Sequence, residues 1–158
     1  MAPNERSARR SRRVLVVASR YNEAVTRKLL EGASETLRQE GIGESDVTIV
    51  WVPGAFELPA AVHVGLATGR YDLAVALGAV IRGDTPHFEY VAGEATRGLG
   101  SAATRFGLPV GFGLLTCDTM QQALDRAGGD RGNKGSEAAA SALAAAAVLD
   151  GLRDVAES

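Results

Sequence analysis

The chain has 158 residues, of which 46% are hydrophobic and 23% are charged. This length is typical of one domain and this composition of a globular fold, which excludes the collagen, coiled-coil and wholly disordered classes. No apolar run approaches the roughly 20 residues that span a bilayer, and Cys117 has no second cysteine to pair with. We therefore expect a cytoplasmic protein without a membrane partner or a secretory segment.

The first 13 residues differ in charge from the rest of the chain. They hold five arginines and one glutamate, so this segment carries +4; because the whole chain carries −2, the remainder carries −6. We predict a disordered Arg-rich arm over residues 1–13 and a single domain over residues 14–158. The acidic body argues against a nucleic-acid partner, which would require positive charge on the folded surface. Docking of the arm to an acidic partner and an organelle transit peptide are the alternatives.

Strands and helices alternate along the chain. The run VLVVA at 14–18 indicates a strand buried on both faces, and a helix follows from a cap at Asn22 to Gly41. Further strands are predicted at 47–52, 73–81 and 110–116, and further helices at 58–68, 86–106, 118–127 and 136–155. Asp118 and Gln121 resemble a capping box, and a glycine-rich loop separates the last two helices.

This alternation predicts right-handed βαβ crossovers and hence an α/β fold. We expect a three-layer αβα sandwich with a flavodoxin-like, four-stranded parallel sheet and helices on both faces. Sheets of this kind bind ligands beyond the carboxyl ends of their strands. The segments to examine are therefore 19–22, 53–57, 82–87 and 116–118.

Two glycine-rich segments resemble nucleotide-binding motifs in composition only. The GxGxxA pattern at 98–103 falls inside a predicted helix, and the segment 129–136 lacks the Gly-Lys-Ser/Thr ending and follows a helix. The acidic cluster and the phosphorylatable aspartate of receiver domains are absent from the expected places. No metal-ligand cluster, paired-carboxylate motif or Ser/His/Asp order is recognisable either.

The segment Arg82-Gly-Asp-Thr-Pro-His87 follows the most apolar strand. Gly83 lets the backbone approach a ligand closely, Thr85 can cap the next helix and Pro86 fits its first turn. Free N–H groups and the helix dipole favour a phosphate there. His87 can transfer protons at this place, but a solvated histidine explains it equally well. His63 has no motif around it, which favours a structural role.

Other candidate residues follow the remaining strands. Glu57 can hold the hydroxyls of a sugar-like chain, and Tyr21 can stack on a planar heterocycle. Arg126 and Lys134 flank the glycine-rich loop and can grip phosphate. Each has a packing or surface role as its alternative, and together they leave acid–base chemistry on a phosphorylated substrate as the remaining hypothesis.

Four segments taken together closely resemble the lumazine synthases. They are VVASRYN (16–22), WVPGAFELP (51–59), ALGAVIRGDTPHFEYV (76–91) and the spaced residues of ALDRAGGDRGNKG (123–135). The resemblance extends in order over nearly all of residues 14–155. It implies a transferase that condenses 5-amino-6-ribitylaminouracil with 3,4-dihydroxy-2-butanone 4-phosphate to 6,7-dimethyl-8-ribityllumazine, phosphate and water, the penultimate step of riboflavin biosynthesis. It implies no cofactor and no metal.

The resemblance also assigns roles to individual residues. His87 would be the proton-transfer residue, with Lys134 assisting phosphate binding. The butanone phosphate would be bound by Asp84 and Thr85, and by Arg126 from a neighbouring subunit. The ribitylaminouracil would be bound by Tyr21, Ala55, Phe56, Glu57, Ala79, Val80 and Ile81, and by Phe112 from that neighbour.

The same resemblance implies a homopentamer, in some members assembled into a 60-subunit icosahedral shell, with riboflavin synthase as a further partner. The Gly128–Gly135 turn resembles the short version of shell-forming members, whereas the Arg/Ser arm replaces the apolar start that adds a strand to a neighbour's sheet. A non-catalytic flavin or lumazine carrier and a purely structural shell protein are the rival hypotheses. Neither needs a phosphate site beside a proton donor, so His87, Arg126 and Glu57 together argue against both.

Overall fold

A parallel four-stranded sheet forms the centre of the molecule in the computed structural model, which describes residues 11–157. The strands are β1 (Val14–Ser19), β2 (Val47–Val52), β3 (Leu73–Ile81) and β4 (Val110–Cys117). Their order across the sheet is β2-β1-β3-β4, and every pairing is parallel. The predicted α/β class and four-stranded parallel sheet are confirmed.

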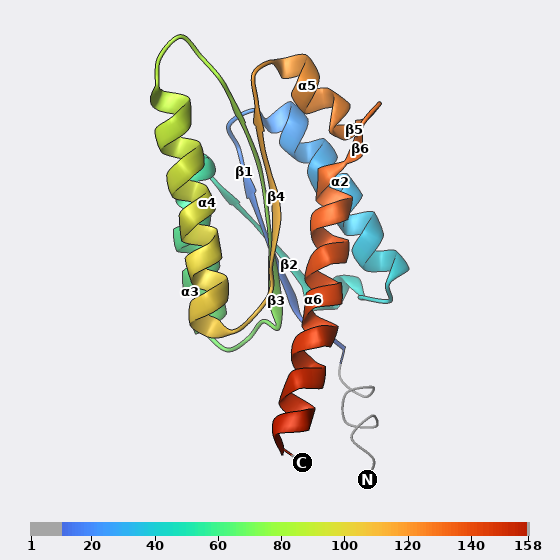
Figure 1. Ribbon diagram of the computed structural model, residues 1–158. Coiled ribbons are helices and arrows are strands. Elements are labelled where there is room, and N and C mark those ends of the chain that lie inside the picture. Colours follow the sequence, from blue (N-terminus) through green and yellow to red (C-terminus); the bar gives the residue numbers. More distant parts are fainter. Residues whose placement is uncertain (1–10, 158) are drawn as a thin grey trace.

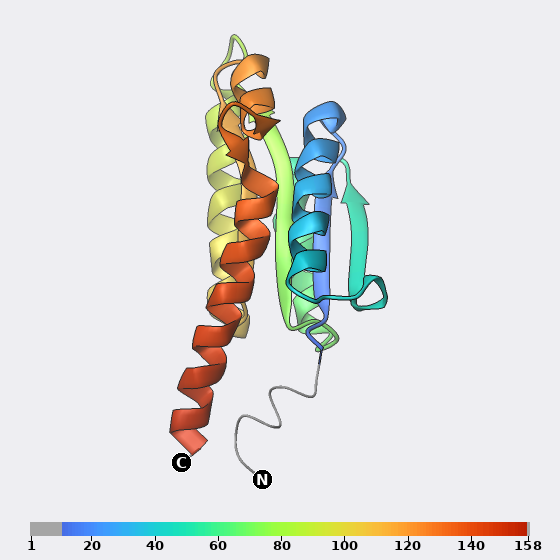
Figure 2. The ribbon, with the colours of Figure 1, turned by 90° about the vertical axis from the view of Figure 1, so that its right-hand side faces the viewer.

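Helices cover both faces of the sheet, which makes three layers (Figure 1). Helices α3 (Leu58–Ala67) and α4 (His87–Phe106) lie on one face, and α2 (Glu23–Gln39) and α6 (Lys134–Glu157) lie on the other. Figure 2 shows α2 and α6 side by side over this second face. Short helical turns at Glu44–Asp46 (η1), Ala55–Glu57 (η2) and Met120–Asp125 (α5) complete the connections.

Two hydrophobic cores lie between these layers because side chains of the central strands alternate in direction. On β1, Val14 and Val16 join the core under α2 and α6, while Leu15 and Val17 join the core under α3 and α4. All six residues of β1 are buried, as the unbroken apolar run predicts. All the strands point the same way, so their carboxyl ends share one edge, at the top of Figure 1.

The predicted glycine-rich loop is instead a small hairpin, so this prediction is wrong. Strands β5 (Ala127–Gly129) and β6 (Gly132–Asn133) pair antiparallel. The Asn133 side chain donates to Lys28 O of α2 (2.9 Å) and accepts from the N–H groups of Gly135 (2.8 Å) and Ser136 (3.1 Å). Because this amide satisfies the first turn of α6, the helix begins at Lys134 rather than at residue 136.

Two predicted caps are also wrong. Asn22 has left-handed backbone geometry (φ 61°), and its side chain donates to Ala79 O (2.8 Å) instead of capping α2. At α5 the capping box is formed by Thr119 and Gln122, one residue later than the predicted pair. At α2, the Asn22 side chain bonds to the distant residue Ala79 in place of the local cap. At α5, a polar residue stands three positions before a glutamine in both the predicted and the observed pair, so the capping-box pattern does not distinguish them.

Close helix packing at Gly135 leads to a stability prediction. An added Cβ there would overlap the carbonyl group of Leu29, 2.7 Å from its carbon, where α6 crosses α2. Gly151, in the same helix, has open space around its Cα. We expect Gly135→Ala to destabilise the fold by at least about 2 kcal/mol and Gly151→Ala to stabilise it by about 0.5–1 kcal/mol. Urea unfolding of both variants checks this; equal midpoints would contradict it.

Polar contacts join the start of the described chain to Asp72, just before β3, and to helix α6. The Arg13 N–H donates to Asp72 Oδ2 (2.7 Å), and Arg12 lies 3.0 Å from Asp150 of α6. Residues 1–10 of the predicted disordered arm lie outside the described residues. Within residues 11–157, no helix is both long and apolar enough to cross a membrane.

Candidate active site

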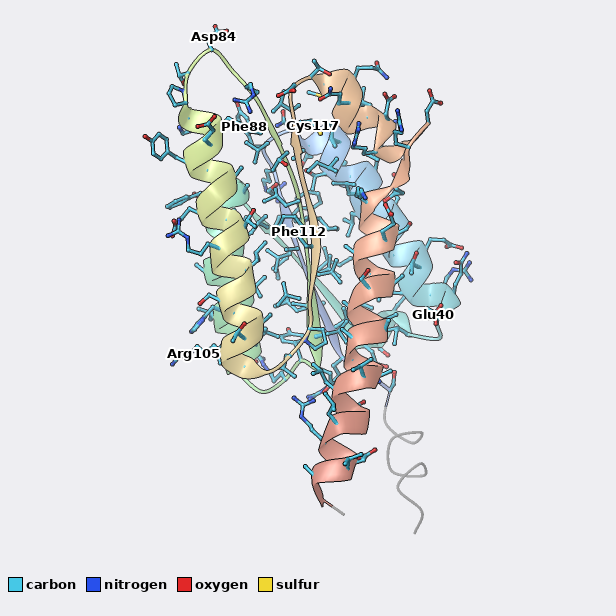
Figure 3. The ribbon with its side chains drawn as sticks, in the orientation of Figure 1. Glu40, Asp84, Phe88, Arg105, Phe112 and Cys117 are labelled. Carbon is cyan, nitrogen blue, oxygen red and sulfur yellow. The ribbon has the colours of Figure 1, made fainter. Side chains whose placement is uncertain are left out.

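The larger of two pockets near the strand ends has a volume of about 750 Å³ and opens where β1, β2 and β3 end. It lies on the α4 side of the sheet, and Gly83 and Thr85 of the long β3–α4 loop are in its wall. Asp84 lies at the tip of this loop (Figure 3). Its walls are Tyr21, Gly54, Ala55, Phe56, Glu57, Ala79, Val80, Ile81, Gly83, Thr85, His87, Phe88, Tyr90 and Val91.

Backbone hydrogen bonds hold the β1–α2 turn beside the ends of β2 and β3. The Arg20 and Tyr21 N–H groups donate to the carbonyls of Val52 (2.8 Å) and Pro53 (3.0 Å). Asn22 ties the same turn to Ala79 on β3. These bonds fix the turn while the Tyr21 ring stays 74% exposed at the pocket wall, free to stack on a ligand.

Glu57 is held in the short helical turn η2. One of its carboxylate oxygens accepts a hydrogen bond from the Gly54 N–H (3.2 Å). Ala55 and Leu58 on either side are buried in the core below, whereas the Phe56 ring is exposed. The turn therefore presents a fixed carboxylate and an aromatic ring to the same pocket.

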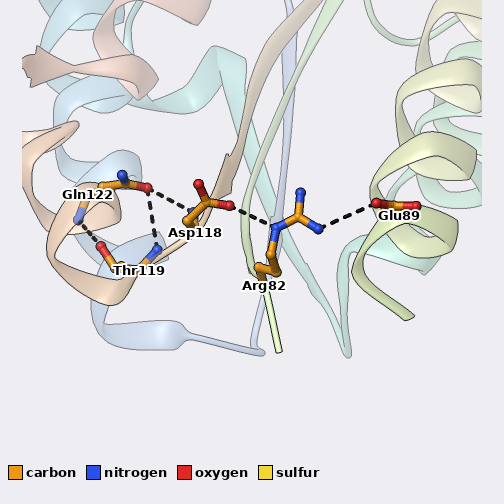
Figure 4. Close-up of polar contacts among 5 residues, drawn as sticks. All are labelled: Arg82, Glu89, Asp118, Thr119 and Gln122. Atoms are coloured by element: carbon orange, nitrogen blue, oxygen red, sulfur yellow. Dashed lines mark hydrogen bonds and ion pairs between the residues drawn. The ribbon is translucent and has the colours of Figure 1, made fainter. Parts of the chain in front are cut away.

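The β3–α4 loop is fixed at its start by Arg82. The backbone N–H of Arg82 donates to Cys117 O (2.8 Å). Figure 4 shows its guanidinium, which donates to Asp118 (2.8 Å) and Glu89 (3.4 Å). The hydrogen bonds that the Arg82 guanidinium donates to Asp118, and then to Glu89, raise its pKa, so it stays charged. Beyond Arg82, the loop passes Gly83 and reaches α4.

The start of α4 supplies anion-binding groups. The helix begins at His87, with Pro86 at the N-cap. Thr85 does not form the predicted side-chain cap of the helix; its hydroxyl oxygen only accepts a long hydrogen bond from the His87 N–H (3.4 Å). The positive end of the dipole of this 20-residue helix makes the place suited to a phosphate. In this structure the N–H groups of His87 and Glu89 are bonded to Thr85 Oγ1 (3.4 Å) and Pro86 O (2.9 Å).

A second, smaller pocket of about 290 Å³ lies along β4, one of the two edge strands of the four-stranded sheet. It is lined by Phe112, Leu114, Leu115, Thr116, Cys117, Arg126 and Lys134. Figure 3 shows Phe112 midway along β4 and Cys117 near its end. Arg126 donates to Gln122 O (3.0 Å) through one guanidinium nitrogen, and the Lys134 N–H donates to Arg126 O (2.8 Å). The pocket thus combines an exposed ring with two cations.

The structure divides the predicted site residues into two groups. Those expected to bind the uracil substrate from the same chain, together with Thr85 and His87, line the larger pocket. Phe112, Arg126 and Lys134 line the smaller one, and among the described residues none lines both. Asp84 lies at the loop tip and lines neither pocket.

Sequence reasoning missed four residues of the larger pocket, Gly54, Phe88, Tyr90 and Val91, whereas it had singled out Gly83 for close backbone approach to a ligand. Gly54 and Gly83 line it through backbone, and Phe88, Tyr90 and Val91 belong to the first turns of α4. A usable signal was present, because a helix that begins at His87 carries residues 90 and 91 on the same face as the histidine. Outside the pocket, the pairing of Arg82 with Asp118 joins segments 36 residues apart, and no local pattern indicates it.

Outside these pockets, two further sequence interpretations are checked by packing. His63 packs edge-on against Phe106, with ring centroids 4.8 Å apart, as expected of a structural histidine. Gly98 lies inside α4, where an added Cβ would come within 2.6 Å of Pro59. The lack of a side chain at this position therefore serves helix packing rather than nucleotide binding. The described residues contain no group of three or more His, Cys, Asp or Glu able to hold a metal ion.

Cys117 offers a prediction about pH. Burial raises the pKa of its thiol; Arg126 lowers it and Asp118 adds to the rise. Its neutral form is therefore favoured in the folded state, a stabilisation that is complete below the unfolded pKa of about 8.5 and is lost as pH rises through the folded value. We expect Ellman's reagent at pH 8 to modify native Cys117 at least about tenfold more slowly than the thiol in urea. Equal rates would contradict this.

Comparison with known proteins relates this site to one family. The family model of 6,7-dimethyl-8-ribityllumazine synthase matches residues 11–150. A protein of that name from Gemmatimonas aurantiaca is 58% identical over 139 residues, covering 88% of this chain and 83% of the relative. Those from Anaeromyxobacter dehalogenans strain 2CP-C and Edwardsiella ictaluri are 54% and 50% identical, covering 85% and 89% of this chain and 83% and 91% of their own. With its sheet, its two pockets and this identity, the chain belongs to the 6,7-dimethyl-8-ribityllumazine synthase family.

Proposed function

We propose that this chain condenses 5-amino-6-ribitylaminouracil with 3,4-dihydroxy-2-butanone 4-phosphate, releasing 6,7-dimethyl-8-ribityllumazine, phosphate and water. It thereby performs the penultimate step of riboflavin biosynthesis. Family membership supports the reaction. The observation that carries the proposal for this site is one pocket at the strand ends that brings together an exposed tyrosine, a fixed carboxylate and a histidine at a helix start.

The uracil substrate occupies the side of the pocket formed by β1, β2 and β3. Tyr21 stacks on the pyrimidine ring, and the backbone of Ala79–Ile81 meets its polar edge. Ala55 and Phe56 flank the ribityl chain, whose hydroxyl protons the Glu57 carboxylate accepts. The support is the placement of all these residues along one continuous wall.

The butanone phosphate occupies the side formed by the β3–α4 loop. Its phosphate lies against Thr85 and the first N–H groups of α4, and Asp84 contributes through its backbone at the loop tip. The positive end of the helix dipole supports an anion there. His87, in the first turn, then lies beside both substrates.

The chemistry follows from this arrangement. The amine on the uracil attacks the ketone to form an imine with loss of water, and phosphate leaves as an enol develops. The enol tautomerises to a ketone, and the second nitrogen attacks this carbonyl and closes the ring with loss of a second water. His87 moves protons during these steps, which contributes about 10² to 10⁴ in rate, whereas holding two substrates face to face contributes roughly 7 to 11 kcal/mol. Positioning therefore dominates the rate acceleration.

A neighbouring copy completes the site. Phe112, Arg126 and Lys134 line a pocket separate from that of His87, so in this proposal they serve the next subunit, where Phe112 covers the ring and Arg126 pairs with phosphate. The assembly is a homopentamer. In this proposal it can assemble further into a 60-subunit shell, and riboflavin synthase is its further partner. Light scattering of the purified protein distinguishes pentamer from shell. We place this assembly in the cytoplasm, which the lone thiol Cys117 supports.

The test of the function is an absorbance assay with both substrates. We expect the lumazine product to appear only when both are present. A non-catalytic carrier would bind ribityl-bearing heterocycles without forming product, and a structural shell protein would do neither. Either result with the folded, assembled protein would refute the proposal.

A further inference from the structure

A chain of polar contacts runs from α4 to α5 and joins the two pockets. Glu89 pairs with Arg82, Arg82 with Asp118, and the Gln122 side-chain oxygen accepts from the Asp118 N–H (2.8 Å), as Figure 4 shows. Gln122 continues the chain, since its backbone carbonyl accepts from the Arg126 guanidinium (3.0 Å). We name Glu89, Arg82, Asp118 and Gln122 the polar bridge.

Arg82 is the centre of the polar bridge. Its guanidinium contacts a carboxylate on each side and lies 4.6 Å from the centroid of the Phe88 ring, which lines the larger pocket. Its backbone N–H is bonded to the last residue of β4. A planar guanidinium can hold two carboxylates and a ring at once, which a lysine ammonium on its flexible stem does poorly.

Stability does not explain this arrangement. The side chains of Arg82, Asp118 and Glu89 are 46%, 65% and 67% exposed, and exposed ion pairs contribute little to the free energy of unfolding. What the polar bridge does determine is where two segments lie. Arg82 starts the loop that carries Gly83 and Thr85 and leads to His87. Asp118 leads into α5, and Arg126 directly follows the end of that helix.

We propose that Arg82 is a positioning residue for phosphate binding, acting through the polar bridge on the β3–α4 loop and on Arg126. This inference rests on the proposed function, because the loop is where that function places the phosphate. Arg82 does not itself contact the substrate. Without the polar bridge, the β3–α4 loop moves away from the position in which it and the start of α4 bind phosphate. The pocket wall that contains Tyr21 and Glu57 is unaffected.

The experiment compares Arg82→Gln, Arg82→Lys and Asp118→Asn with the control Arg97→Gln. Arg97 is an exposed arginine of α4 that pairs with Glu94 (3.2 Å) and lines neither pocket. We expect Arg82→Gln to raise KM for the butanone phosphate about tenfold, with less than a twofold change for the uracil substrate. Arg82→Lys should recover part of the loss, and Arg97→Gln should behave as wild type. Equal constants for Arg82→Gln and Arg97→Gln would overturn the inference.

Asp118→Asn distinguishes a positioning role of Arg82 from direct phosphate contact, because the two roles predict opposite changes in phosphate affinity. Removing a negative charge favours an anion, so if Arg82 bound phosphate directly, this variant would bind it as well as wild type or more tightly. If Arg82 acts by positioning, binding weakens despite the favourable charge change. The double variant Arg82→Gln/Asp118→Asn should then bind phosphate no more weakly than the weaker-binding single variant, because both changes remove the same contact.

Calorimetric titration with inorganic phosphate makes the test independent of turnover. We expect a weaker Kd for Arg82→Gln and Asp118→Asn than for wild type and Arg97→Gln. If wild type forms no lumazine product but this order of Kd holds, the proposed function fails and the positioning role stands. If wild type is active and all four proteins bind phosphate equally, the positioning role fails and the proposed function stands.

Discussion

Replacing Arg126 by alanine is expected to lower kcat/KM by about 10³, a larger loss than removal of the histidine in the larger pocket. Arg126 lines the smaller pocket together with Lys134, and one of its guanidinium nitrogens is held by Gln122 O, which orients the rest of the fork. An arginine that neutralises a departing phosphate acts on charge that develops in the transition state, and such groups contribute about 10³ to 10⁵ in rate. Lys134 recovers only part of this as a point charge.

The matched change is His87→Ala, for which we expect measurable turnover at about 10² below wild type, the low end for general acid–base catalysis. Water can still carry protons to an imine or enol, and the pocket still holds both substrates. Initial rates with saturating uracil substrate and varied butanone phosphate separate the two variants. Arg131→Ala is the control, since Arg131 lies between β5 and β6 and lines neither pocket. A folded His87→Ala protein with no activity, beside a more active Arg126→Ala, would reverse this ranking.

Mixing two impaired variants, each with a different pocket altered, is expected to restore activity. Glu57→Gln/His87→Ala damages the larger pocket, and Arg126→Ala damages the smaller one. If each active site joins the larger pocket of one copy to the smaller pocket of the next, a mixed assembly contains sites with two intact halves. Random mixing at equal amounts makes about a quarter of the sites whole, so activity should rise to about a quarter of wild type.

Co-refolding the two variants and assaying product formation checks this. Two variants with damage in the same pocket, Glu57→Gln/His87→Ala and Tyr21→Ala, give the matched control, because no pairing of these chains restores a whole larger pocket. Activity of the first mixture no higher than the sum of its separate components would show that one chain holds the complete site. That outcome would also remove the reason to assign Phe112 to a neighbouring copy.

The strands of the sheet could be predicted from short stretches of sequence because their signal is local. The run at 14–18 is apolar without interruption, and the structure buries β1 on both faces. Helix ends near Gly41, Gly69 and Gly107 were recognisable because these glycines have positive φ, which other residues adopt at a cost. Each of these features depends on residues that are neighbours in the chain.

Part of the larger pocket was also predictable by a topological argument, whereas Ala55, Phe56 and Ala79–Ile81 were implied only by the resemblance to the lumazine synthases. Parallel strands end at one edge, so Tyr21, Glu57 and His87 had to lie near the same edge once the alternation of strands and helices was recognised. The hairpin of β5 and β6 was not predictable in this way. It depends on Asn133 reaching Lys28, a contact between residues 105 positions apart.

Periodicity, glycine positions and residue chemistry act over a few positions in the chain, so they predicted the class of fold, the order of its elements and several residues able to bind a phosphorylated sugar fragment. The bonds from Asn22 to Ala79 and from Arg82 to Asp118 became visible only in the folded chain. These pairings follow from how the strands are ordered in the sheet and how the loops meet above it. Spatial proximity of that kind leaves no local pattern in the chain.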